Sequence, residues 1–427
     1  MLKIPAVGKK PTPGGGHFTH NEMKRILIFL PYVPYPLRRG TFQRVYNLTK
    51  ELATHFEVDL FCLSSEEEDA QHLPRFEAFC NRVRFTPFQN VPWAPFFTDR
   101  IWHPLPVTIR HWWSDSALSA FREFTAGQDY EIISFCDLVL WPYVKEVFPD
   151  HPARVMDRSR VDWLYQTEVL DTVKQGFLTQ LKSRENLSKI ARLEKEVRRE
   201  LDLMVVCGPD DKTFLESKLG LSDQIHVLAN GADVEFFNAA EWPPASTPFP
   251  SALFCGALDY APNVDGLGWY YEKIHPLVME RLPDFKILLV GKNPTEEVRK
   301  HADLPGVEFF GEVPDVRPYY QKAWMQIVPL RIGGGTRLKI AEGMAMANPV
   351  VSTTLGAQGL ELHHEKELLL ADTPEEFAAA IARYAADENL RREHGTAGHR
   401  AIHSLYTWSA LGASLAERFN QLIPKMP

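Results

Sequence analysis

Three consecutive glycines followed by two cations and a carboxylate form the part of this sequence best suited to chemistry. The set comprises Gly333, Gly334, Gly335, Arg337, Lys339 and Glu342. Glycine has no Cβ, so the backbone can turn sharply there and approach a ligand closely. A loop of N–H groups that opens a helix attracts an anion, and the two cations add full positive charges beside it. The spacing therefore predicts a phosphate site.

The plainer alternative is an exposed helix in which Lys339 and Glu342 form a surface pair three residues apart, worth only about 0.2–0.5 kcal/mol. Three glycines between an apolar strand and a cationic helix start favour the anion site instead. The common nucleotide motifs give no help, because G-x-x-x-x-G-K-[ST] is absent and no G-x-G-x-x-G stands at this point.

The elements around these residues are predicted to be a strand, a glycine loop, a helix and a second strand. Residues 325–330 are mostly apolar and predict a buried strand. Thr336 is the expected N-cap of the helix, and Asn348-Pro349 is its expected end. Placing the residues every 100° gives two faces. The apolar face holds Leu338, Ile340, Ala341, Met344 and Ala345, and the other face holds Lys339, Glu342 and Gly343.

The same alternation of strands and helices runs along most of the chain, in two series. In the first series, strands are predicted at residues 26–30, 58–63, 83–85, 130–140, 154–157, 204–207 and 225–228. The helices of this series include residues 41–54, which follow Gly40, and a long charged helix at residues 177–203. The second has strands at 252–255, 286–290 and 307–310, a helix at 264–282, and helices from residue 374 to the end. Two such series predict two parallel-sheet domains, each with a ligand edge at the carboxyl ends of its strands.

Length and composition exclude several other classes of protein. A chain of 427 residues suits two domains, and a net charge of −8 argues against a nucleic-acid binder that works by overall basic charge, which leaves a local basic patch open. Five scattered cysteines without a C-x-x-C pair indicate a reducing compartment, with neither zinc nor disulfides. No apolar run is long enough to span a membrane. Residues 1–22 lack the apolar segment of a secretory signal, and we expect a disordered extension there.

Aromatic and arginine residues gather at residues 91–113. Two interpretations are open for this segment. It is either a membrane-surface or acceptor-binding element, or a loop packed on its own domain, and the second is slightly favoured.

From about residue 23 the chain resembles the retaining, nucleotide-sugar-dependent glycosyltransferases of family 4, which have the GT-B fold of two Rossmann-like domains. The similarity is greatest to bacterial exopolysaccharide sugar transferases. Four segments carry the resemblance in the family's order and spacing: residues 37–48, 228–233, 256–265 and 326–360. Tyr406-Thr407-Trp408 before a last helix also resembles the end of the family's chains.

The resemblance implies a division of the chain into five parts. Residues 23–241 would form the acceptor-side domain, behind the extension at 1–22. Residues 242–250, which are rich in proline, would be the linker. Residues 251–405 would form the donor domain, and residues 406–427 a helix that packs back on the first domain.

The family's E-x7-E motif implies roles for the residues of the glycine loop and its helix. Glu342 matches the second glutamate, which holds the ribose hydroxyls, but Gly334 stands where the first glutamate would contact the transferred sugar. Either backbone N–H groups of the loop replace that contact, or the choice of donor differs. Arg337 and Lys339 are the candidates for neutralising the departing diphosphate. The remaining donor-binding candidates are Gly334, Gly335, Thr336, Gly311, Val313, Asn263 and Gly40.

This assignment implies a reaction without a metal or a cofactor. Cations and a helix dipole would stabilise the charge that develops on the diphosphate, and the sequence has no D-x-D motif. The partners would be a nucleotide sugar and a glycan or lipid-linked acceptor, with no nucleic acid. We expect a cytoplasmic protein with peripheral contact at the inner face of the membrane.

Two other functions compete with this one. Gly334 in place of a glutamate leaves room for a non-catalytic nucleotide-sugar-binding partner in glycan assembly. A dinucleotide oxidoreductase is disfavoured, because no strand is followed by the glycine fingerprint and its downstream acid.

Overall fold

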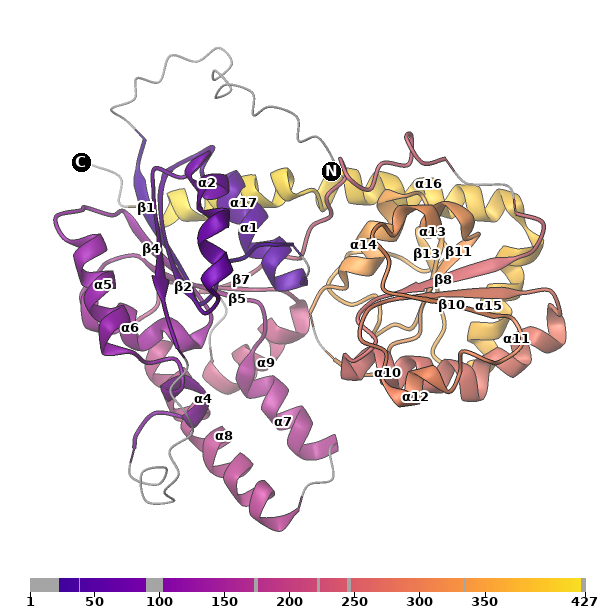
Figure 1. Cartoon of the computed structure of the whole chain (residues 1–427), viewed down its shortest axis with the longest axis horizontal. Helices are drawn as coiled ribbons and strands as arrows, with labels where there is room; N and C mark the ends of the chain where they lie inside the picture. The colour runs from indigo at the N-terminus through magenta and orange to yellow at the C-terminus, as the bar shows by residue number, and fades with distance from the viewer. Residues whose placement is uncertain are drawn as a thin grey trace. The chain divides into compact units, whose positions relative to one another are not determined.

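The computed structural model describes residues 23–37, 39–89, 103–172, 176–220, 223–243, 247–333 and 335–423. The chain divides into two compact units (Figure 1). The first unit comprises Met1–Asp157, Glu185–Met204 and Leu415–Pro427, and the second comprises Arg158–Arg184 and Val205–Ser414. The predicted extension at residues 1–22, residues 91–102 of the aromatic segment and Gly334 lie outside the described residues. The domain boundaries inferred from the resemblance stay a prediction.

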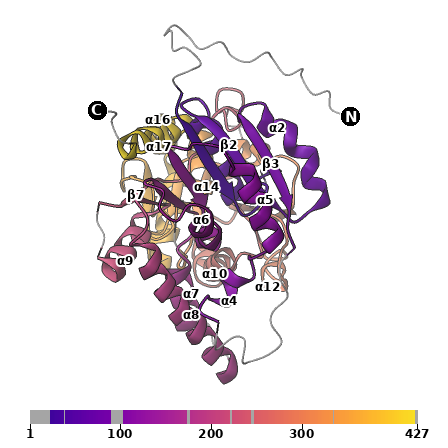
Figure 2. The ribbon, with the colours of Figure 1, turned by 90° about the vertical axis from the view of Figure 1, so that its left-hand side faces the viewer.

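A seven-stranded sheet forms the centre of the amino-terminal part of the chain, with strand order β3-β2-β1-β4-β5-β6-β7 (Figure 2). Its strands are β1 (Arg25–Leu30), β2 (Glu57–Ser64), β3 (Arg82–Pro87), β4 (Ile132–Cys136), β5 (Arg154–Arg158), β6 (Leu203–Val206) and β7 (Ile225–Val227). The β1–β2, β1–β4, β2–β3 and β4–β5 pairs are parallel. Every residue of β4 is buried, as expected for a parallel strand covered on both faces.

Helices connect these strands. They are α1 (Gly40–Leu52), α2 (Leu73–Glu77), α4 (Val107–Arg110), α5 (Asp115–Thr125), α6 (Trp141–Val147), α7 (Asp162–Thr172), α8 (Phe177–Val197) and α9 (Pro209–Leu219). In the core of the first unit, the Phe29 ring stacks on Phe121 at 4.4 Å between centroids and meets Phe61 edge-on at 5.2 Å. This aromatic cluster joins β1 and β2 to α5.

The second sheet has six strands in the order β10-β9-β8-β11-β12-β13, and all its pairs are parallel. Its strands are β8 (Ser251–Cys255), β9 (Lys286–Val290), β10 (Val307–Gly311), β11 (Met325–Val328), β12 (Val350–Ser352) and β13 (Leu368–Leu370). The helices of this part are α10 (Ala261–Trp269), α11 (His275–Arg281), α12 (Glu296–Arg299), α13 (Arg317–Lys322), α14 (Leu338–Ala345), α15 (Pro374–Ala386), α16 (Glu388–Leu405) and α17 (Trp408–Leu422).

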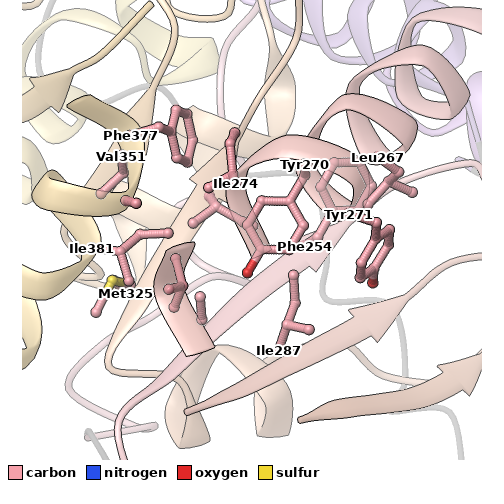
Figure 3. Close-up of a cluster of buried hydrophobic side chains, with 14 of the residues drawn as sticks. Phe254, Leu267, Tyr270, Tyr271, Ile274, Ile287, Met325, Val351, Phe377 and Ile381 are labelled. Carbon is pink, nitrogen blue, oxygen red and sulfur yellow. The ribbon is translucent and has the colours of Figure 1, made fainter. Parts of the chain in front are cut away.

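Alternate residues of these strands pack into two different cores, one on each face of the sheet. On one face, Phe254, Ile287 and Met325 meet Tyr270, Phe377 and Ile381 from the helices (Figure 3). On the other face, Leu253 and Leu288 pack with Ile340 and Met344 of α14. The second sheet is therefore covered on both faces, and the prediction of two Rossmann-like parallel sheets is confirmed.

Three predicted elements differ from the structure. The strand predicted at 130–140 ends at Cys136, because Asp137 takes a positive φ of 64° and starts a short 3₁₀ turn. The single helix predicted at 264–282 is divided by a π-helical turn, Tyr270–Ile274, next to Pro276, which has no N–H to continue the ladder. The helix predicted at 177–203 ends at Val197, and Leu203 begins β6.

Among the residues that the structure describes, no helix is both long and apolar enough to cross a membrane.

Candidate active site

The candidate site is built on β11, the glycine loop and α14, in the order predicted. Ile340 and Met344 bury one side of α14, while Lys339 and Glu342 are only partly covered. The N-cap of α14 is Arg337, and its side chain makes no capping hydrogen bond. The predicted cap at Thr336 is wrong. The Thr336 hydroxyl instead donates to the Cys207 carbonyl at 2.8 Å and accepts from the Asn230 N–H at 3.2 Å, so it is not available to α14.

Three contacts hold the loop that leads into α14. Arg337 Nη2 donates to the Gly333 carbonyl at 2.5 Å, which closes the loop on its own helix start. Arg331 donates two hydrogen bonds to the Asp265 carboxylate of α10, at 3.1 and 2.7 Å. Gly333 has a φ of +97° and lies so close to α10 that a Cβ there would reach Pro262 Cγ at 3.0 Å. The loop conformation is thus fixed by α10 as well as by α14.

Lys339 points from α14 to the carboxyl end of β8. Its Nζ donates to Asn263 Oδ1 at 2.9 Å and lies 4.1 Å from the centroid of the Phe254 ring. Asn263 is buried and donates from Nδ2 to the Ala257 carbonyl at 2.7 Å, so its oxygen is directed at the ammonium group. A Cβ on Gly256 would stand 2.9 Å from Nζ, so the glycine provides the room for this cation. Two of the predicted donor-binding residues therefore meet directly.

The pKa of Lys339 is lowered from 10.5 to about 7, chiefly by burial and also by the nearby Arg337 cation. The field of the Glu342 carboxylate acts in the opposite direction without restoring the usual pKa. Burial also raises the pKa of the Cys255 thiol to about 12, with a contribution from the Glu342 carboxylate, so this thiol stays neutral. A desolvated ammonium group beside a guanidinium group is a cluster that a bound anion would stabilise.

Gln326, which the sequence analysis did not single out, and Gly343, which it placed on the face of Lys339 and Glu342, set the position of α14. Gln326 is fully buried in β11, and its Nε2 donates to the Lys339 carbonyl at 2.8 Å. Gly343 lets α14 lie close to the Gln326 side chain of β11, because a Cβ at position 343 would lie 2.0 Å from Gln326 Oε1. The signal in the sequence was a glutamine at the centre of an otherwise apolar strand. Such a buried amide requires a partner.

The other predicted site residues are distributed over the end of β10, the loop before α14 and the start of α1. Gly311 ends β10, the edge strand of the second sheet, with a φ of +67°, and its carbonyl accepts from the Gly291 N–H at 2.8 Å. Val313 follows it and is partly buried against the core. Gly335 precedes Thr336 in the loop, while Gly40 is the first residue of α1 in the first unit. The donor-binding role of each stays a prediction.

A separate ionic cluster lies in the first unit, at the end of β5. Arg44 of α1 is almost fully buried, and its Nη2 donates to Asp157 Oδ1 at 2.8 Å. The sequence pattern gives no indication that Arg44 and Asp157 are partners, because 113 positions separate them. Among the described residues, no group of three or more histidine, cysteine, aspartate or glutamate side chains is arranged to hold a metal ion.

Comparison with solved structures identifies the class of protein that this architecture defines. Sucrose-phosphate synthase from Thermosynechococcus elongatus superposes with a TM-score of 0.67 at 19% identity, covering 93% of this chain and 99% of that one. Anabaena HepE in complex with UDP and glucose gives a TM-score of 0.62 at 12% identity, with 93% and 99% covered. The chain has the GT-B glycosyltransferase fold.

Sequence comparison finds a family model that matches part of the chain. Residues 249–387, which include the whole of the loop and α14, match the family model described as glycosyl transferases group 1. The matched residues make up about a third of the chain, and over them the chain is similar to this family.

Two relatives differ in how much of the chain they match. An uncharacterized 44.6 kDa protein in the cps region of Klebsiella pneumoniae is 22% identical over 380 residues, covering 87% of this chain and 93% of that protein. Phosphatidyl-myo-inositol mannosyltransferase of Mycolicibacterium smegmatis is 28% identical over 204 residues, covering 45% of this chain and 51% of that enzyme. The match to the mannosyltransferase thus spans about half of its length.

Proposed function

We propose that this chain transfers a sugar, with retention, from a nucleotide-diphosphate sugar to a glycan or lipid-linked acceptor in exopolysaccharide or cell-surface glycan synthesis. The observation that carries the proposal is the position of Lys339. Its partly desolvated ammonium group lies in the first turn of α14, next to Arg337 and directed by Asn263. A diphosphate is the ligand whose charge matches this arrangement.

In this proposal each part of the donor has its own partner. Lys339 and Arg337 bind the diphosphate together with the N–H groups at the start of α14, and Glu342 binds the ribose hydroxyls. The main chain around Gly334, Gly335 and Thr336 contacts the transferred sugar in place of the family's first glutamate. Gly311, Val313 and Asn263 complete the donor site in the same unit.

The chemistry follows from where charge develops. The bond between the anomeric carbon and the phosphate oxygen breaks, and the leaving nucleoside diphosphate keeps the electron pair. The acceptor hydroxyl attacks from the face that the diphosphate leaves, and its proton passes to a diphosphate oxygen. Positive charge on the anomeric carbon and negative charge on the diphosphate both increase in the transition state. Lys339 and Arg337 act on the second charge, and removing one such contact costs about 10²–10³ in rate.

The relatives support the proposed biological context. The Klebsiella pneumoniae relative is described as a protein in the cps region. A Rhizobium leguminosarum relative is described as a lipopolysaccharide core biosynthesis mannosyltransferase, and the Mycolicibacterium smegmatis enzyme as a phosphatidyl-myo-inositol mannosyltransferase. These names favour a cell-surface glycan or a lipid-linked acceptor. We propose that the transfer takes place at the cytoplasmic face of a membrane.

The experiment is a screen of nucleotide sugars by thermal shift, followed by turnover of the donors that bind. Donor hydrolysis and sugar transfer are then compared for the wild type, Lys339→Ala and Glu342→Ala. The matched control is Lys300→Ala, since Lys300 is an exposed lysine of the same unit. We expect kcat/KM to fall at least about 100-fold for the two site variants and to stay unchanged for the control. Nucleotide binding without turnover of any donor, or near-normal turnover by both site variants, would contradict the proposal.

A further inference from the structure

Helix α8 has two halves of different character. Its buried residues are Asn186, Ile190, Leu193, Glu194 and Val197, all in the second half. They follow the spacing of one helix face, which is the face that packs on the protein. Residues 177–185 include no buried side chain. In both views α8 lies beside α7, and its first turn is at the free end of this helical hairpin (Figures 1 and 2).

The exposed first half of α8 carries large apolar side chains. Phe177 is 74% exposed, Leu178 is 71% exposed and Leu181 is 47% exposed. The first two have the highest exposures among the large apolar side chains that the structure describes. A single exposed leucine is ordinary, but three large apolar residues within five positions form a patch that indicates a binding partner.

Two exposed cations lie in the same stretch of α8 as this patch. Residues 176–184 contain two exposed cations, Lys182 and Arg184, and no acidic residue. The chain as a whole has a net charge of −8, so general electrostatic attraction would not bring it to an anionic surface. At physiological ionic strength charges are screened beyond about 8 Å, so the local cations at the end of a helix still act on a surface in contact with them.

We infer that the first half of α8, Phe177 to Arg184, is a membrane-docking element that inserts Phe177, Leu178 and Leu181 at the headgroup level of an anionic bilayer. Lys182 and Arg184 then lie among the lipid phosphates. Shallow insertion of an apolar helix face flanked by cations is a common way for a protein to lie on a bilayer. The inference rests on the proposed function for its purpose, since a lipid-linked acceptor is held in a membrane.

The size of the patch favours a bilayer over a protein partner. A stable protein interface needs about 800 Å² from each partner and some 20–30 residues. Three apolar side chains at the end of one helix fall short of that, whereas a bilayer accepts a few apolar side chains at any point of its surface.

The test uses the full chain and sedimentation with vesicles, without donor or acceptor. Phosphatidylglycerol-rich vesicles are compared with pure phosphatidylcholine vesicles at low and high salt. We expect the wild type to bind the anionic vesicles, with binding weakened by salt. The double variant F177S/L178S should weaken the partition coefficient about tenfold or more. Lys182→Glu with Arg184→Glu should also weaken it at least about tenfold.

Matched controls come from the same helix and from another exposed leucine. Arg192→Glu with Lys195→Glu makes the same change of net charge on exposed residues in the second half of α8. Leu405→Ser removes an apolar side chain that is 50% exposed on α16. Both controls should bind vesicles as the wild type does. Donor hydrolysis in the absence of vesicles should be unchanged in all these variants, which separates loss of docking from failure of the proposed catalytic site.

Three outcomes would overturn the inference. They are no binding of the wild type to anionic vesicles, equal losses in the test and control charge variants, and a wild-type dimer that F177S/L178S converts to a monomer. The last result, measured by light scattering, would assign the patch to a contact between two copies of the chain.

Discussion

At the scale of single residues, Lys339 links the sequence motif to a measurable electrostatic property. Its ammonium group has a pKa of about 7, chiefly because burial removes it from water. Below that pH the free site carries the charge that a diphosphate requires. Above it the lysine loses its proton, and binding an anion must bring that proton back.

The affinity for a nucleoside diphosphate should therefore depend on pH in one direction. Between pH 7 and the usual lysine pKa of 10.5, we expect the Kd to rise by up to about tenfold per pH unit. Below pH 7 this contribution should be flat. Calorimetric titration across pH, in buffers of different ionisation enthalpy, measures both the Kd and the proton taken up. Lys339→Gln should abolish the proton uptake, and Lys300→Ala should retain it. A wild type that takes up no proton at pH 8 would contradict this assignment.

The stability of the free protein follows the same pKa. Because the folded value lies below the unfolded value, the unfolded chain binds more protons between pH 7 and 10.5. The contribution of Lys339 to the free energy of unfolding therefore rises as pH rises through this window.

Gly343 has a packing role that a second helical glycine allows to be tested. A Cβ at Gly343 would lie 2.0 Å from Gln326 Oε1, whereas one at Gly268 of α10 would have only Glu297 Oε1 near it, at 4.0 Å. Gly343→Ala should reduce the free energy of unfolding by about 1–3 kcal/mol through overpacking. Gly268→Ala should leave it unchanged or raise it by about 0.5–1 kcal/mol. Urea unfolding of both variants measures the difference. Equal effects would show that the contact with Gln326 is easily relieved.

The residue-level site was only partly predictable. Arg337, Lys339 and Glu342 share one short segment, so spacing along a helix was enough to group them. Asn263 became a candidate through the resemblance, but its contact with Lys339 spans 76 positions and depends on how α10 packs. The role of Thr336 was missed because helix-cap preference considers only local backbone, while its hydroxyl bonds to residues more than 100 positions away.

At the scale of elements, the glycine loop is held by α10 through a pair of charged side chains. Arg331 and Asp265 form a bidentate ion pair, and their side chains are 46% and 30% exposed. Such an exposed pair contributes at most about 1 kcal/mol to stability. We expect loss of this ion pair to affect donor binding more than stability. The loop between Arg331 and Arg337 contains the main chain that the donor would contact.

Asp265→Asn should therefore raise the KM for the donor several-fold and change kcat less. Loss of the ion pair lets the loop move, and each binding event must then order it again. Steady-state kinetics separates KM from kcat, and thermal unfolding reports on stability. Glu365→Gln is the matched control, because Glu365 forms a comparable exposed bidentate pair with Arg383 elsewhere in the second unit. If both variants raise KM equally, the effect comes from general destabilisation and not from the loop.

Element prediction succeeded where a pattern was local. The buried strands have continuous apolar runs, so most of their predicted bounds agree with the structure to within one or two residues. It failed where backbone geometry interrupts a run. The π-helical turn Tyr270–Ile274 lies within a continuous apolar helical pattern, and only the hydrogen-bond ladder reveals it. Similarly, Leu138–Leu140 continues the apolar run of β4 beyond Asp137, although the chain has already left the sheet.

At the scale of the whole molecule, the chain does not simply complete one unit before it begins the other. Leu415–Pro427 belongs to the first unit, although the preceding residues from Val205 belong to the second. Alternating strands and helices predict two parallel sheets, but they contain no information about such an exchange of chain segments. The expectation of a returning last helix came only from the family resemblance.

The returning segment contributes to the core of the first unit through Phe419. This side chain is 1% exposed, and its ring centroid lies 6.1 Å from that of Phe56. Phe419→Ala should lower the free energy of unfolding of the first unit by about 3–5 kcal/mol, because it leaves a cavity beside Phe56. Urea unfolding followed by hydrogen exchange measures the loss and assigns it to one of the units. The control is Glu417→Ala, which changes an exposed residue of the same helix and should have little effect.

The same variant also tests whether donor binding depends on the stability of the first unit. All the residues proposed to bind the diphosphate lie in the second unit. A nucleoside diphosphate at about 100 times its Kd should therefore still stabilise that unit by about 2.7 kcal/mol in Phe419→Ala, as in the wild type. Sugar transfer also needs an acceptor, which we predict to bind the acceptor-side domain. The rate of transfer should therefore fall in proportion to the fraction of molecules whose first unit is unfolded. Loss of nucleotide binding in Phe419→Ala would show that the donor site is not confined to the second unit.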